Sequence, residues 1–335
     1  MQHKCLMYSD FARCTGLRAF QTHERAEVKS PLVAADLRSQ SGVAGERDPV
    51  QGIAWVFPGL FVVLWSTGFV GAKLGLAYAE PATFLVIRFL IVIALLLPLC
   101  AWMRAPWPST PAQWLHMGFA GALIQAGYLG GVFLSLHRGM PAGVSSLITG
   151  LQPILAAVLS GWLLGERTNA RQWFGLLLGV GGVALVVHEK WVLEGVGAAA
   201  TALSVVALAS ISLGAIWQKR YCARVDLRTG AAIQFAAAAL VLAPYAWMFE
   251  TRQVVWSPTL LAVLAWLVFA LSLGAVFLLF WLIRHGAATK VASLMYLVPP
   301  CTALVAWPLF GETYTVYSAA GMAVAMLAVW LVSKG

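Results

Sequence analysis

The sequence predicts an all-α integral membrane protein with ten transmembrane helices arranged as two inverted five-helix repeats. Apolar residues make up 61% of the chain and charged residues only 10%, against about 25% charged in soluble domains. The apolar residues gather in runs long enough to cross a bilayer. The pattern of residues 144–187 returns 146 positions later, in residues 291–332. Long apolar spans that recur at a fixed offset indicate a duplicated membrane protein.

The first 50 residues differ from the rest of the chain. They hold seven Lys or Arg and six Asp or Glu, and they lack a long apolar run. Without an apolar core this stretch does not read as a cleaved signal peptide. We expect residues 1–52 to form a poorly ordered cytoplasmic tail, with residues from an over-long gene model as the alternative.

Ten apolar spans follow the tail, with short connections that leave no room for a soluble domain. They are 53–74, 81–103, 113–135, 144–165, 172–188, 196–218, 229–249, 259–282, 289–310 and 315–333. The first repeat is therefore expected at residues 53–190 and the second at 195–334.

The distribution of Lys and Arg predicts the orientation of these spans. With the N-terminus in the cytoplasm, seventeen of these residues lie in cytoplasmic segments and four in external ones, and Arg88 lies inside a span. Positively charged loops favour the cytoplasmic side. We therefore expect a multi-pass protein of the cell (inner) membrane with both termini cytoplasmic.

The offset of 146 residues relates many pairs of identical residues. They are Gly68 and Gly214, Lys73 and Lys219, Pro153 and Pro299, Gly165 and Gly311, and Glu166 and Glu312. Because each copy has five spans, an odd number, the second copy must enter the membrane from the opposite face. Transporters with inverted repeats bind their substrates near the midplane, where the repeats meet.

Three prolines, Pro153, Pro299 and Pro300, indicate interrupted helices in both repeats. A proline inside a helix frees the carbonyl four residues earlier, and in a membrane such a group must face protein or a wet cavity. The polar side chains of Thr149, Gln152 and Tyr296 lie beside these prolines. A structural kink is one interpretation. We favour a substrate-binding site, because the feature recurs in both repeats.

Arg88 is the charged residue that lies well inside a span, seven positions after Pro81, or about 10 Å deep at 1.5 Å per residue. A charge at this depth normally faces the bundle interior and has a function. Arg88 either contacts substrate or a gate, or it pairs with a helix end; its counterpart in the second repeat is Gln234.

Further polar and aromatic residues could line a substrate path, and helix packing explains them equally well. They are Trp65, Ser66, Gln125, Tyr128, Trp217 and Gln218. At the turns, Glu166 and Glu312 are expected to cap a helix or to pair with Arg167 or Arg171.

The histidines lack metal-ligand spacing, so we predict no metal and no cofactor.

Several of these features together resemble the EamA family of the drug/metabolite transporter superfamily. The residues that carry the resemblance are Trp65–Lys73, Glu80-Pro81, Arg88-Phe89, and the two sets of proline and Gly-Glu turn described above. The resemblance covers about residues 53–333. It implies export or exchange of small metabolites, often amino acids. We therefore expect a secondary transporter, an exporter of small metabolites such as amino acids, that works by alternating access.

Two other classes of function are alternatives to a carrier. A membrane-embedded enzyme would need a cluster of acidic, histidine or cysteine residues within the spans, and all seven acidic residues outside the tail lie at span ends or in loops. A channel or structural membrane protein is the other alternative. Nucleic-acid binding is not expected, because no basic stripe accompanies the net charge of +9. A small-molecule substrate and the lipid bilayer are the expected partners, and the sequence leaves monomer and homodimer open.

Overall fold

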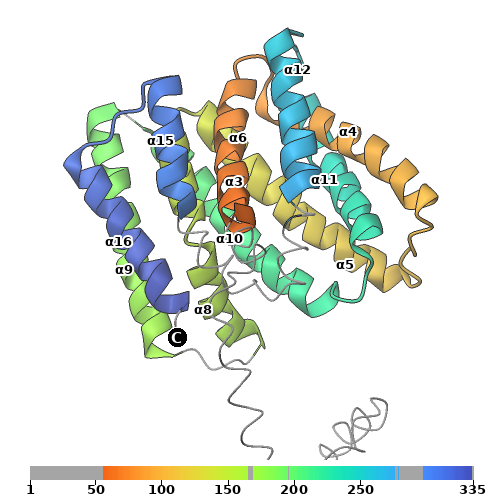
Figure 1. The fold of residues 1–335 in the computed structure, drawn as a ribbon, viewed down its shortest axis with the longest axis horizontal. Coiled ribbons are helices and arrows are strands. Elements are labelled where there is room, and N and C mark those ends of the chain that lie inside the picture. Colours follow the sequence, from red (N-terminus) through yellow and green to blue (C-terminus); the bar gives the residue numbers. More distant parts are fainter. Residues whose placement is uncertain (1–55, 165–168, 195, 276–277, 279–296, 334–335) are drawn as a thin grey trace, which may run out of the picture. The chain divides into compact units, whose positions relative to one another are not determined.

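The structure, a computed structural model, describes residues 56–164, 169–194, 196–275, 278 and 297–333. Over these ranges it is helical, with no strand (Figure 1). The helices are α3 (Val56–Gly75), α4 (Pro81–Trp102), α5 (Pro111–Gly121), η2 (Ala122–Leu129), α6 (Gly130–His137), α7 (Ala142–Thr149), α8 (Gln152–Leu164), α9 (Ala170–Glu194), α10 (Ala198–Tyr221), α11 (Leu227–Phe249), α12 (Pro258–Ala265), η3 (Trp266–Ala275), α15 (Val298–Phe310) and α16 (Val316–Ser333). The predicted tail, residues 1–52, lies outside the described ranges.

Six helical stretches within the described ranges are long and apolar enough to cross a membrane. They are Pro81–Trp102, Pro111–His137, Ala142–Gly161, Ala170–Trp191, Ala198–Tyr221 and Leu227–Phe249. The described ranges also contain four shorter apolar helices. The predicted all-α membrane class is therefore confirmed, whereas the count of ten spans and the inverted repeat stay predictions.

Local sequence explains where several helices begin and end. Helix α5 starts at Pro111 behind Thr110, whose hydroxyl accepts from the Gln113 amide, and α12 starts at Pro258 behind Ser257 in the same way. Proline suits the first turn because its missing N–H has no helical partner there. Helix α15 ends at Gly311 with a φ of 65°, a left-handed conformation that favours glycine.

The predicted interruption at Pro153 is present. Helix α7 ends at Thr149 and α8 begins at Gln152, so the span breaks just before the proline. At the position related by the 146-residue offset, Pro299 and Pro300 occupy the first turn of α15. The residues before Leu297 that would place this turn in mid-span, Tyr296 among them, lie outside the described ranges.

Two pairs of helices approach each other closely enough to exclude side chains. Helices α9 and α16 run side by side (Figure 1), and Gly182 faces Gly321 across their crossing. Helix α5 meets α11 at Gly121, where an added Cβ would lie 2.5 Å from the Gln234 Cα. Glycine permits such backbone contact, and it is the usual device for helix packing in membranes.

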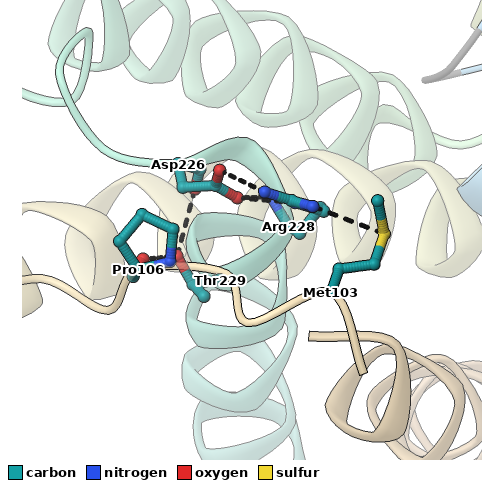
Figure 2. A network of polar contacts seen from close by, with 5 residues as sticks. All are labelled: Met103, Pro106, Asp226, Arg228 and Thr229. Carbon is teal, nitrogen blue, oxygen red and sulfur yellow. Dashed lines mark hydrogen bonds and ion pairs between the residues drawn. The ribbon is translucent and has the colours of Figure 1, made fainter. Parts of the chain in front are cut away.

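A network of polar contacts ties the segment after α4 to the start of α11 (Figure 2). The guanidinium of Arg228 donates to the Asp226 carboxylate at 2.8 and 3.0 Å and lies 3.3 Å from the Met103 sulfur. The Thr229 hydroxyl donates to the Pro106 carbonyl at 2.9 Å. Hydrogen bonds from Arg228 hold the pKa of Asp226 below its usual range. This carboxylate is therefore ionised at neutral pH and caps α11.

Candidate functional site: an aromatic cavity around a buried arginine

A cavity of about 130 Å³ lies among α3, α4, η2, α6, α10, α11 and η3. Most of its wall is aliphatic or aromatic. The lining residues are Trp65, Gly68, Phe69, Ala72, Arg88, Ile124, Gln125, Tyr128, Leu129, Val132, Phe133, Ile211, Phe235, Leu271 and Ser272. An apolar pocket with a few convergent polar groups is the usual form of a small-molecule site.

Arg88 supplies the charge of this cavity and is only 5% exposed. Its Nη2 atom donates to the Leu267 carbonyl at 3.2 Å and to the Ser272 hydroxyl at 3.0 Å, both on η3. Its Nε atom is buried without a hydrogen-bond partner in the described part of the chain. Among the described residues, the polar groups that reach Arg88 are thus neutral, and none of them balances its charge.

The start of α4 fixes how deep Arg88 lies. The carboxylate of Glu250, at the end of α11, accepts from the backbone amides of Ala82 and Thr83 at 2.8 and 2.7 Å. In return, Glu80 accepts from the backbone amide of Thr251 at 2.6 Å. Each carboxylate satisfies amides at the other helix end, so the register of α4 against α11 is set at that end.

Two π-helical segments form part of the wall. η2 contributes Gln125 and Tyr128, and η3 contributes Leu271 and Ser272. The two segments, residues 122–129 and 266–275, correspond under the 146-residue offset. π-Helical turns are rare and often occur at functional sites, and here each directs side chains toward the same cavity.

The cavity brings together four of the predicted substrate-binding residues, Trp65, Arg88, Gln125 and Tyr128. It also contains Phe69, Phe133, Phe235 and Ser272, which sequence reasoning did not select. Phenylalanines and a serine within apolar spans are indistinguishable from packing residues in one sequence. The duplicated π-helical segments, which place Ser272 against Arg88, have no sequence signature.

Thr149 and Gln152, also predicted to bind substrate, do not line this cavity. The Thr149 side chain is buried, and its hydroxyl donates back to the Ser145 carbonyl of its own helix at 2.9 Å. Gln152 is half-buried at the start of α8. The predicted Tyr296, Gly165 and Glu166 lie outside the described ranges.

The three remaining candidates lie against other helices. Ser66 is buried, and its hydroxyl donates to the Val62 carbonyl at 2.7 Å and to the Val298 carbonyl at 3.3 Å, which links α3 to α15. Trp217 packs its ring among His116, Phe119 and Tyr221. The Gln218 side chain accepts from Gln234 at 3.5 Å.

Glu312, which lies between α15 and α16, contacts the end of α3 and the start of α7. Its carboxylate accepts from Lys73 Nζ and from the Ala142 amide, each at 2.7 Å, and from the Tyr314 hydroxyl. It therefore caps α7, one of the two roles expected for it, and its ion-pair partner is Lys73; Arg167, named in the other expectation, lies outside the described ranges. Burial raises the pKa of Glu312, but the bonds from Lys73, Tyr314 and Ala142 outweigh it and hold the pKa below the usual range.

Glu189 is a buried carboxylate near the end of α9. It is 8% exposed and accepts from the Ser318 hydroxyl at 2.9 Å, while its Oε1 has no partner among the residues described. The neighbouring Lys190 donates to the Thr313 carbonyl. The sequence suggested an unremarkable span end, because position along a helix does not reveal burial.

Comparison with known proteins places this fold in a family. The profile of the EamA-like transporter family matches residues 51–188 and 199–334. The uncharacterized transporter YvbV of Bacillus subtilis is 28% identical over 274 residues, 81% of this chain and 88% of that protein. A probable amino-acid metabolite efflux pump of Escherichia coli is 28% identical over 161 residues, 48% of this chain and 52% of that protein. A solved crystal structure shares the fold with a TM-score of 0.55 at 22% identity, over 84% of this chain and 96% of that chain. The chain therefore belongs to the EamA-like transporter family and is a multi-pass membrane transporter.

Proposed function

We propose that the protein is a secondary transporter that exports small metabolites such as amino acids by alternating access. Its ten spans form two five-helix repeats of opposite orientation, residues 53–190 and 195–334. The protein lies in the cell (inner) membrane with both termini in the cytoplasm. The repeats rock against each other around the cavity that contains Arg88.

The helix contacts support a two-fold relation between the repeats, because equivalent helices of the two repeats make equivalent contacts. Helix α3 packs on α15 and η3, while its counterpart α10 packs on α8 and η2. Counterparts also pack directly on each other, as α4 does on α11 and α9 does on α16. A pseudo-two-fold axis in the membrane plane produces such exchange-related pairs.

The observation that carries the proposed function is the unbalanced charge of Arg88 in a cavity walled by both repeats. Arg88 and Gln125 come from the first repeat, and Phe235 and Ser272 from the second. A site shared between two halves changes its access when the halves move. The relative from Escherichia coli named a probable amino-acid metabolite efflux pump supports export and the class of solute.

Flux through reconstituted protein distinguishes a carrier from a channel or an enzyme. We expect proteoliposomes preloaded with amino acids to accumulate labelled amino acid by counterflow, with uptake that saturates with concentration. A channel instead gives flux that rises linearly and shows no stimulation by solute on the far side. Recovery of chemically altered solute would contradict a transport function and favour a membrane-embedded enzyme.

Labelling of single cysteines tests the inverted repeat. Ser109 and Gln253 are exposed residues in equivalent interhelical segments of the two repeats. In a variant without the native cysteines, we expect a membrane-impermeant maleimide to label Gln253→Cys from outside intact cells. Ser109→Cys should react only in inside-out vesicles. Labelling of both from one side would rule out the inverted arrangement.

A further inference from the structure

We propose that the Arg88 cavity selects small monocarboxylates that lack a fixed positive charge, with the carboxylate bound by Arg88. This rests on the transport function proposed above and changes its preferred substrates from amino acids to acids that lack an ammonium group. The N–H donors on Nε and Nη1 of Arg88 have no partner within the described ranges, since the bonds of the guanidinium there all come from Nη2. A buried cation without an anion is costly. A carboxylate supplies both the missing charge and the acceptors that a guanidinium binds best.

The described lining of this cavity has no carboxylate that could pair with the ammonium group of a substrate. The described lining contains neither Asp nor Glu. Residues 276–277 and 279–296, which lie outside the described ranges, also contain neither Asp nor Glu in the sequence.

The acidic side chains described elsewhere do not line the cavity, and each accepts at least one hydrogen bond away from it. Glu80 binds Thr251, Glu250 binds Thr83, Glu312 binds Lys73, Asp226 binds Arg228, and Glu189 binds Ser318. The described part of the cavity wall thus carries one positive charge and no negative one. A zwitterion would bury an ammonium without a carboxylate partner, whereas a monoanion leaves the site neutral.

The cavity wall also indicates the size of the solute and the apolar character of the part that does not bind Arg88. Five residues of the wall, Trp65, Phe69, Tyr128, Phe133 and Phe235, present aromatic surface around Arg88. The cavity of about 130 Å³ is well above the roughly 10–15 Å³ that a single water molecule requires, so it has room for a compact organic acid. A dianionic phosphate ester would leave a buried negative charge unpaired, because the described lining supplies only Arg88 against it.

Matched pairs of 2-oxo acid and amino acid test the charge rule. The pairs are phenylpyruvate with phenylalanine, and 4-methyl-2-oxopentanoate with leucine, each measured by counterflow into proteoliposomes of the full chain. Within a pair the solutes differ chiefly by the ammonium group. We expect the oxo acid to have the lower apparent KM by about 5- to 150-fold, the range for one unpartnered buried polar group.

Variants then assign the preference to Arg88. Arg88→Gln should raise the apparent KM for the oxo acids and bring it close to that for the amino acids, while Arg88→Lys keeps part of the preference. Arg104→Gln, at an exposed arginine outside the cavity, should behave as the wild type. The wild-type comparison needs no variant, so a misfolded Arg88→Gln protein still leaves the charge rule tested.

The possible outcomes show whether the proposed substrate class, the role of Arg88 or the transport function itself is wrong. Preference for the amino acid in both pairs overturns the charge rule and leaves transport standing. An unchanged oxo-acid preference in a folded Arg88→Gln variant overturns the role of Arg88. Absence of counterflow for all four solutes and for a mixture of the twenty amino acids contradicts the transport function itself.

Discussion

Replacing Gly182 or Gly321 with leucine is expected to abolish the folded protein. A Cβ at Gly182 would lie 2.7 Å from the Gly321 carbonyl oxygen, and one at Gly321 would lie 2.7 Å from the Gly182 carbonyl oxygen. The obstacle is backbone, which cannot rotate aside. Overpacking a core costs about 1–3 kcal/mol where side chains can move, so we expect about 3 kcal/mol or more at this crossing of α9 and α16.

Gly181→Leu is the matched control. It lies beside Gly182 on the same helix, and a Cβ there would meet nothing within 4 Å. Size-exclusion chromatography and thermal melting in detergent measure the result. We expect a monodisperse, stable Gly181→Leu protein, and aggregation or loss of the Gly182→Leu and Gly321→Leu proteins. If all three variants melt together, the glycine crossing does not hold α9 against α16.

Glu312→Ala is expected to lower the stability of the protein by about 2–4 kcal/mol. Removing one partner of a buried ion pair costs about 3–5 kcal/mol, and the partial exposure of Lys73 (28% of its side chain) reduces this figure. The Ala142 amide and the Tyr314 hydroxyl would lose their acceptor as well. At about 2–4 °C per kcal/mol for a chain of this size or somewhat smaller, the melting temperature should fall by several degrees.

A double-mutant cycle with Lys73→Met isolates the ion pair from the capping of α7. We expect Lys73→Met/Glu312→Ala to be less destabilised than the sum of the single variants, by about 1–3 kcal/mol, since the double variant leaves no charge unpaired. Additive effects would show that Glu312 acts through the α7 amides alone.

The acid dependence of this contribution follows from the lowered pKa of Glu312. Unfolded glutamate takes up its proton near pH 4.3, while the folded carboxylate resists protonation to lower pH. The stabilisation is thus complete above the ordinary pKa and is lost as pH falls through the folded one. Wild type and Glu312→Gln should therefore differ at neutral pH and converge only in strong acid.

Arg88 illustrates how much of a binding site a single sequence can predict. A charged residue within an apolar run is costly in lipid, so the sequence identified Arg88 without knowledge of its neighbours. It left substrate contact and structural pairing open, because it could not show whether a partner was near. The structure supplies Leu267 and Ser272 as neutral partners, and the unbalanced charge is the basis for the substrate class proposed here.

Hydropathy and backbone chemistry determined much of this protein from the sequence. Apolar runs specify spans because the bilayer excludes charge, Pro153 interrupts its helix because it lacks an N–H, and Gly311 ends α15 because it accepts a positive φ. The tertiary structure decided which polar groups meet. Lys73 reaches Glu312 from 239 positions away, and Thr149 bonds to its own helix instead of lining the cavity. Such contacts depend on how each helix rotates and how its neighbours pack, which are properties of the assembled bundle and not of any one span.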